Sequence, residues 1–150
     1  MNQVVVKQEK SGYQIVEAYK SLRTNLQFCG EDKKVIAVTS CTPNEGKSSV
    51  SMQLGISLAE GGKRVILIDA DLRKSVLLGR TKTQKSVRGL AHFLSGQATL
   101  EDVICSTNVK NFYMIYSGPF PPNPAELLGG KNFRSLLNAL RKVYDYVIVD

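Results

Sequence analysis

The chain has 150 residues, 43% hydrophobic and 22% charged, so it can bury a core but is too short for two ordinary domains, and nothing in its composition argues for disorder. Lysine and arginine exceed aspartate and glutamate by 20 to 13, but the cations are scattered, which argues against nucleic acid as the partner. No apolar run approaches the roughly 20 residues that span a bilayer, and three cysteines without CxxC spacing predict free thiols, so we expect a cytoplasmic protein.

The first half of the chain predicts two helices and two strands. An amphipathic helix repeats apolar residues every three or four positions and ends near glycine, whereas a buried strand is a short, continuous apolar run. By these criteria the elements are a helix at 13–28, a buried strand at 35–39, a helix at 47–60 and a buried strand at 64–69. A strand, helix and strand in this order form part of a parallel sheet.

The second half begins with residues 72–88, which lack periodicity and predict an irregular connection. The elements predicted beyond it are short helices at 89–94 and 100–104, a strand at 112–116, a helix at 132–143 and a strand at 146–150. Four prolines within residues 117–124 predict a rigid loop, because proline fixes φ and removes a donor. We therefore expect an α/β fold, a parallel sheet with helices on both faces.

The strongest motif is Gly46-Lys47-Ser48, placed between a predicted strand and a helix start. A phosphate group needs close backbone N–H donors, the positive end of a helix, an ammonium group, and a hydroxyl that can bind Mg²⁺. Cys41 stands where the G-x-x-x-x-G-K-[ST] pattern has its first glycine. An ordinary strand-to-helix turn is the alternative, but it leaves Lys47 unexplained. The predicted nucleotide-binding residues are Thr42, Pro43, Asn44, Glu45, Gly46, Lys47, Ser48 and Ser49.

Carboxylates follow two of the predicted strands. Asp69 and Asp71 come at the end of one, and Asp150 comes at the end of another. The carboxyl ends of parallel strands line the ligand crevice, so these groups would lie near the phosphates. We predict catalytic roles for Lys47, Asp69 and Asp71, and Mg²⁺ binding by Ser48, Asp71 and Asp150. A capping role for Asp71 is the alternative, and the spacing leaves open which of Asp69 and Asp71 acts as base.

Five segments resemble, in the right order, the motifs of bacterial tyrosine kinases that regulate capsule and exopolysaccharide synthesis. They are residues 38–48 for the Walker A motif, 66–73 for Walker A′, 147–150 for the start of Walker B, 122–128 for the NP-x-ELL segment and 17–25 for the oligomerisation helix. The helix motif of the family has the form E-x-x-R-x-x-R. Here Glu17, Lys20 and Arg23 occupy its charged positions, so a lysine replaces the first arginine.

The resemblance implies a P-loop kinase that uses ATP and Mg²⁺ to phosphorylate tyrosines in its own tail. It also implies a ring of subunits joined through Glu17, Lys20 and Arg23, and control by the cytoplasmic tail of a membrane activator, a polysaccharide co-polymerase that holds the kinase at the inner face of the cell membrane. Residues 1–150 would then be the amino-terminal portion of the kinase domain, without its remainder or its tyrosine-rich tail. Alternatively, Glu17 and Lys20 pair within one chain on a solvated helix face.

Two other functions are compatible with the same motifs. A P-loop ATPase switch that positions plasmids or division sites would share the fold, but its signature lysine would fall at Thr42, and Pro43 replaces a glycine of that group. A fragment that binds nucleotide without catalysis is the second alternative.

Overall fold

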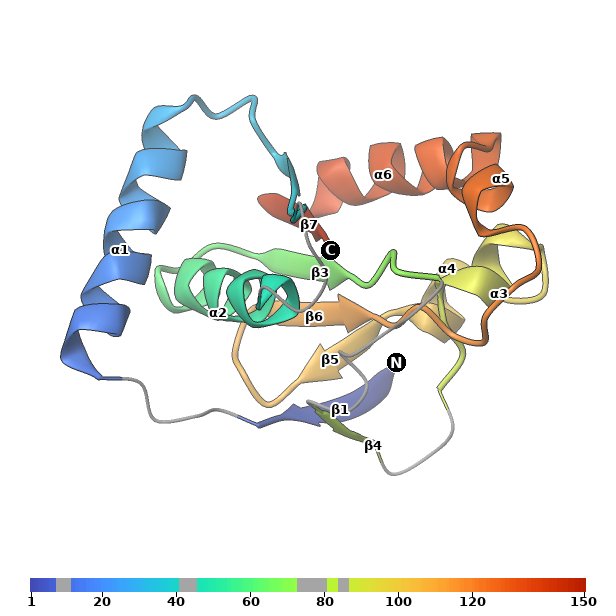
Figure 1. Cartoon of the computed structure of the whole chain (residues 1–150), viewed down its shortest axis with the longest axis horizontal. Coiled ribbons are helices and arrows are strands. Elements are labelled where there is room, and N and C mark those ends of the chain that lie inside the picture. Colours follow the sequence, from blue (N-terminus) through green and yellow to red (C-terminus); the bar gives the residue numbers. More distant parts are fainter. Residues whose placement is uncertain (8–11, 41–45, 73–80, 84–86) are drawn as a thin grey trace.

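A seven-stranded sheet forms the centre of the molecule (Figure 1). The structure is a computed structural model that describes residues 1–7, 12–40, 46–72, 81–83 and 87–150. The strands, in chain order, are β1 Asn2–Val6, β2 Val35–Ala37, β3 Val65–Ile68, β4 Thr81–Thr83, β5 Cys105–Thr107, β6 Phe112–Ile115 and β7 Tyr146–Val149. They lie in the spatial order β2-β7-β3-β6-β5-β1-β4. The β5–β6 and β1–β4 pairs are antiparallel, and the other pairs are parallel.

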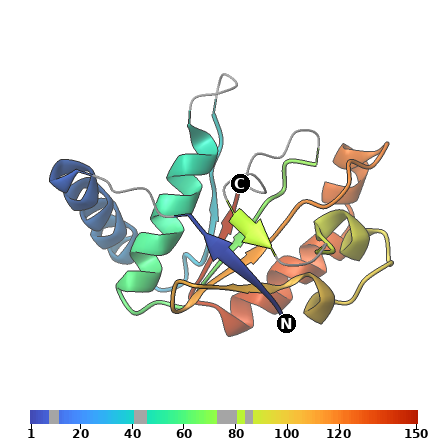
Figure 2. The same cartoon turned by 90° about the horizontal axis from the view of Figure 1, so that it is seen from below.

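Helices cover both faces of this sheet (Figure 2). They are α1 Tyr13–Phe28, α2 Lys47–Glu60, α3 Leu90–Leu94, α4 Leu100–Val103, α5 Pro124–Leu128 and α6 Lys131–Val143. The helices α1 and α2 lie on one side of the sheet, and α3 to α6 lie on the other. This arrangement confirms the predicted α/β fold. None of the described helices is long and apolar enough to cross a membrane.

The strand β3 shows why a continuous apolar run occupies the middle of the sheet. Val65 and Leu67 belong to the core beneath α2, whereas Ile66 and Ile68 belong to the core beneath α6. All four side chains are completely buried. Successive residues of a strand point to opposite faces, so a strand covered on both sides needs apolar residues at every position.

The strands β2, β3 and β7 are parallel, and their carboxyl ends lie on the same side of the molecule, where α2 also begins (Figure 2). The register places Val149 beside Ala37 on one side and Ile68 on the other. The residues that directly follow these three strands therefore lie close together. The sequence predicted this for the residues of the phosphate loop and for the carboxylates.

Two sequence predictions about strands are wrong. The predicted buried strand at 35–39 is only three residues long, and its Val35 is 39% exposed. It stands last in the strand order, with β7 as its one described neighbour, so it lacks cover on its outer side. The connection at 72–88, expected to be irregular, contains β4, which pairs with β1 at the opposite edge of the sheet.

The helix α1 is amphipathic as predicted but packs only lightly. None of its residues is buried, although Tyr19 and Leu26 are partly buried against the core beneath α2. Ile15 and Leu22, the other apolar residues of the predicted stripe, remain 52% and 37% exposed. The attachment of α1 therefore depends on a few contacts with α2.

Candidate functional site

The start of α2 has the backbone geometry of a phosphate-binding turn. Gly46 precedes the helix with φ +78° and ψ 19°, in the left-handed region that favours glycine. A Cβ at this position would meet nothing within 4 Å, so the requirement for glycine is conformational. No described side chain caps this helix start. Its first N–H groups and the positive end of the helix dipole can therefore act on an anion.

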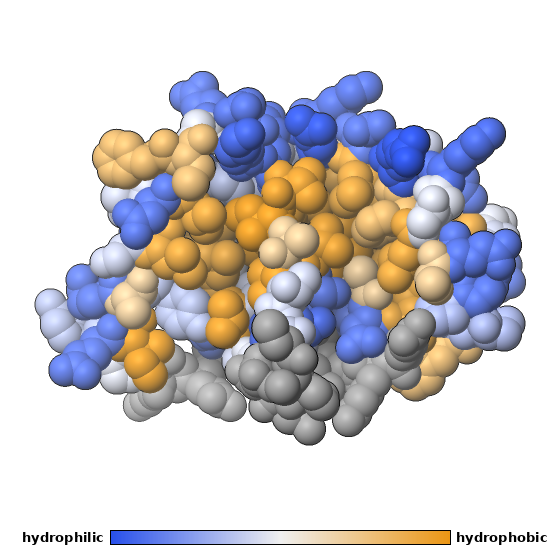
Figure 3. All heavy atoms as spheres, turned by 45° about the horizontal axis from the view of Figure 1, so that its top comes forward, coloured by the Kyte–Doolittle hydropathy of each residue, from blue (hydrophilic) through white to orange (hydrophobic). Residues whose placement is uncertain are grey.

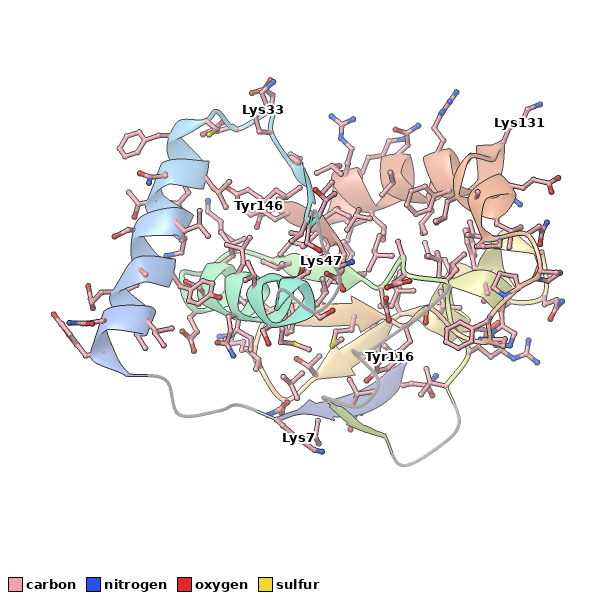
Figure 4. The ribbon with its side chains drawn as sticks, in the orientation of Figure 1. Lys7, Lys33, Lys47, Tyr116, Lys131 and Tyr146 are labelled. Carbon is pink, nitrogen blue, oxygen red and sulfur yellow. The ribbon has the colours of Figure 1, made fainter. Side chains whose placement is uncertain are left out.

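Asp150 joins the start of α2 to the end of β7. The Oγ of Ser48 donates to Asp150 Oδ2 at 3.0 Å, and the Oγ of Ser51 donates to Oδ1 at 2.7 Å. The Nζ of Lys47 lies 3.8 Å from Oδ1. The Asp150 side chain is 1% exposed and that of Lys47 is 24% exposed, so a buried carboxylate is held by two hydroxyls and an ammonium group that solvent can reach. Figure 4 shows Lys47 at this junction.

The turn after β3 lies directly beside Asp150. The Asp150 amide donates to the Ile68 carbonyl at 2.9 Å, and the Ala70 amide donates to the Asp150 carbonyl at 3.0 Å. Asp69 is 1% exposed, and its Oδ1 accepts a hydrogen bond from the Asp71 amide at 3.2 Å. The buried carboxylate of Asp69 thus shapes the turn that presents Asp71, which is half-buried. The alternative that Asp71 caps the next segment concerns residues from 73 onward, which lie outside the described residues, so it stays a prediction.

The predicted site residues fall into three groups. The structure brings Lys47, Ser48 and Asp150 into contact and places the turn of Asp69 and Asp71 beside them by backbone hydrogen bonds. Ser49 follows on α2 and is half-buried. The predicted residues Thr42, Pro43, Asn44 and Glu45, together with Cys41, lie outside the described residues.

The predicted oligomerisation residues lie apart from this site, on α1. Lys20 Nζ is 3.3 Å from Glu17 Oε1 in the same helix. Arg23 Nη1 donates to the Ser57 carbonyl of α2 at 2.7 Å. Within one chain, therefore, Glu17 and Lys20 pair with each other and Arg23 attaches α1 to α2.

Ser51 is the site residue that the sequence analysis missed. It is completely buried, and its Oγ lies 3.1 Å from the Lys47 carbonyl oxygen and 2.7 Å from Asp150 Oδ1, so its one proton can be donated to either acceptor. The available signal was its spacing, because residues three and four apart share one face of a helix and Ser51 follows Ser48 and Lys47 at these distances. Its partner, Asp150, is 99 residues away in the chain.

The chemistry of the site fits Mg²⁺. The Ser48 hydroxyl and the Asp150 carboxylate supply the hard oxygen ligands that Mg²⁺ prefers. Among the described residues there is no group of three histidine, cysteine, aspartate or glutamate side chains that could hold a metal ion unaided. A magnesium ion is usually bound through one or two carboxylates together with waters and substrate phosphates.

The glycine turn before α2, beside the carboxyl ends of the parallel strands β2, β7 and β3, has the form of a P-loop, and the chain belongs to the AAA domain family, whose model matches residues 33–150. Within this family the chain is similar to bacterial tyrosine kinases. Tyrosine-protein kinase CpsD of Streptococcus agalactiae is 43% identical to it over 134 residues, which cover 89% of this chain and 58% of the kinase. These matches confirm the resemblance of its motifs.

Solved structures agree with this assignment. The kinase domain of the Escherichia coli tyrosine kinase ETK superposes with a TM-score of 0.84 at 37% identity, covering 90% of this chain and 53% of that one. The septum site-determining protein MinD from Pyrococcus horikoshii, solved with Mg-ADP, gives a TM-score of 0.64 at 27% identity over 78% of this chain and 48% of that one. The chain spans a little over half the length of the curated relatives it matches.

Proposed function

We propose that the chain is the amino-terminal, nucleotide-binding portion of an ATP-dependent protein-tyrosine kinase that regulates capsular or exopolysaccharide synthesis. The contact of Lys47, Ser48 and Asp150 at the start of α2 is the observation that carries this proposal. The similarity to CpsD and ETK supports tyrosine as the phosphate acceptor. The similarity to ETK exceeds the similarity to MinD in both identity and TM-score, which favours a kinase over an ATPase switch.

Each residue of the site has a distinct role in this proposal. Residues 42–49 surround the phosphates of ATP, with the Lys47 ammonium beside the β- and γ-phosphates. Ser48 and Asp150 hold Mg²⁺, with Asp71 as a further ligand, and the ion neutralises phosphate charge when it is bound. Asp69 shapes its turn, so the half-buried Asp71 is the better candidate to accept the proton of the attacking tyrosine.

The proposed partners come from the kinase family. Further copies of the chain would assemble into a ring through α1. The cytoplasmic tail of a membrane activator, a polysaccharide co-polymerase, would hold the kinase at the inner face of the cell membrane. Calorimetric titration of the chain with a peptide of that tail, with and without Mg-ADP, tests the second partner. Binding of the peptide should tighten when nucleotide is present, if the tail acts on the nucleotide site.

Substitution of Lys47 tests the nucleotide site itself. Lys47→Met should abolish ADP binding measured by calorimetry with Mg²⁺ present, because the ammonium contacts phosphate, while the far-ultraviolet circular dichroism stays unchanged. Lys110→Met, which removes an exposed lysine between β5 and β6, is the matched control and should bind as the original chain does. Unchanged ADP affinity in a folded Lys47→Met variant would exclude the phosphate-loop assignment.

A further inference from the structure

The outer face of α6 carries four cations and no acidic residue. These are Lys131, Arg134, Arg141 and Lys142, all of them exposed, and we call them the α6 basic face. With 3.6 residues per turn, their positions fall within an arc of about 100° around the helix axis. Leu136 and Leu140, on the other side of the helix, are each 1% exposed and pack against the sheet.

No described carboxylate forms an ion pair with any member of the α6 basic face. The positive surface instead continues along the same edge of the molecule. Lys34 Nζ donates to the Arg141 carbonyl at 3.4 Å, which brings residues 33 and 34 beside the end of α6. Figure 4 shows Lys33 and Lys131 at opposite ends of this edge, both pointing away from the sheet. The four α6 cations and Lys34 therefore form an extended strip in which no described ion pair is found, whereas Lys33 beside it is paired with Asp32 at 3.7 Å.

The stability of α6 does not account for the first two of these cations. Arg141 and Lys142 lie in the last turn, where a helix dipole favours positive charge. Lys131 is the first residue of the helix, Arg134 follows it closely, and the first turn contains no acidic residue. The N-cap residue, Gly130, provides no side-chain cap. Positive charge at this end opposes the dipole, so the stability of the helix does not explain Lys131 and Arg134.

Two exposed apolar side chains stand at the ends of helices that reach this edge of the molecule. Val143, the last residue of α6, is 53% exposed, and Phe28, at the end of α1, is 85% exposed. The helix α1 ends at the same edge of the molecule as α6 (Figure 1). Figure 3 shows a row of hydrophilic side chains along this edge, bordered by a broad hydrophobic area. A molecular edge that carries both cations and exposed apolar groups is typical of surfaces that meet a lipid headgroup region.

We propose that the α6 basic face binds directly to a membrane surface rich in anionic phospholipids. Its cations extend over eleven residue steps of a straight helix, about 16 Å at 1.5 Å per residue. All four side chains are exposed on one side of a single helix, so a layer of negative headgroups can approach them together. No aromatic residue lies among them on the outer face to stack on nucleic-acid bases. The binding would orient the kinase towards the membrane independently of any protein activator.

Sedimentation with lipid vesicles tests this proposal. The original chain should bind vesicles of phosphatidylcholine mixed with phosphatidylglycerol, should bind vesicles of phosphatidylcholine alone much less, and should dissociate as salt is raised. Lys131→Glu with Lys142→Glu should weaken binding to the mixed vesicles by at least about tenfold, because each cation near the surface contributes separately. Circular dichroism checks that the variant is folded.

The matched control is Lys7→Glu with Lys110→Glu. Both variants lower the net charge from +7 by the same four units, but Lys7 lies at the opposite edge of the molecule (Figure 4). The control should keep most of the binding. Equal losses in the two variants would show that only net charge matters and would overturn the proposal. So would a failure of the original chain to bind the mixed vesicles at near-physiological salt, or binding to poly-glutamate in preference to the vesicles.

Discussion

Asp69 and Asp71 differ in their surroundings, and this difference predicts different effects of removing each charge. Asp71→Asn should lower the rate of tyrosine phosphorylation by about 10²- to 10⁴-fold, the usual contribution of a general base. Asp69→Asn should have a smaller effect, because the amide oxygen can still accept the Asp71 N–H that shapes the turn. The measurement is single-turnover phosphorylation of a tyrosine-containing peptide by the full-length kinase, with ADP affinity as the control. Wild-type rates in both variants would show that the carboxylates only form the turn.

The two described cysteines should differ sharply in reactivity. Cys29 is exposed, whereas Cys105 is completely buried, and this burial raises the pKa of its thiol to about 11. At pH 8 only about one Cys105 thiol in a thousand would be ionised, and the thiolate is the reactive form. In a Cys41→Ser background, a disulfide reagent should therefore label Cys29 at once and Cys105 only on unfolding. Rapid labelling of both in the native protein would contradict the buried position of β5.

Because the pKa of Cys105 is raised, its contribution to the free energy of unfolding depends on pH. The folded state holds this proton more tightly than the unfolded state, whose thiol titrates near the ordinary value of 9.0. The contribution is therefore fully present below pH 9 and is lost as the pH rises towards 11. Cys105→Ala should reduce the loss of stability over this alkaline interval, as measured by urea unfolding.

Glu17 and Lys20 of α1 form an ion pair within one chain, but the same residues are predicted to join subunits. A substitution can distinguish these two roles. Lys20→Glu removes the pair with Glu17 and places like charges together, but both side chains are about half exposed. The free energy of unfolding should therefore change by less than about 1 kcal/mol. If the pair serves a ring, the oligomeric mass of the full-length kinase in light scattering should fall even so. An unchanged mass would assign the pair to a solvated helix face.

Arg23 is the comparison for this experiment. Its guanidinium is bound to the Ser57 carbonyl of its own chain, so Arg23→Ala should loosen α1 from α2. Hydrogen exchange should then quicken in α1 while β3 and β7 stay protected. A loss of oligomer in Arg23→Ala without faster exchange in α1 would instead show that Arg23 contacts a neighbouring subunit.

Elements with a strong local pattern could be predicted from sequence, and those that depend on distant partners could not. The helices α2 and α6 and the strands β3 and β7 carry their own periodicity or apolar run. The strand β5 has the sequence CST, which has no such pattern, and it forms because β1 and β6 pair with it. In the site, Gly46, Lys47 and Asp150 were recognisable from their places at strand and helix ends. Ser51 was not, because its role requires a carboxylate that only the folded sheet brings near.

The whole molecule contains two cores that share one sheet, which predicts a single unfolding transition. Ile66 and Leu67 are neighbours in β3, are both completely buried, and face opposite cores. Ile66→Ala and Leu67→Ala should each lower the free energy of unfolding by about 2–5 kcal/mol, the usual effect of a large-to-small change in a core. Val35→Ala, on the exposed edge strand, should cost much less. Separate transitions for the two cores, seen by urea unfolding with two probes, would contradict a shared cooperative unit.

The place of β7 in the sheet has a consequence for how the protein is made. This strand lies between β2 and β3, yet it follows every other described strand along the chain. A nascent chain leaving the ribosome therefore has both neighbours of β7 long before β7 itself, and the pairing that joins them has a large sequence separation, which slows folding. Until β7 has been synthesised, the side of the fully apolar β3 that pairs with β7 stays unpaired. Such edges invite aggregation, so we expect the growing chain to need protection by a chaperone until residues 146–149 have been synthesised.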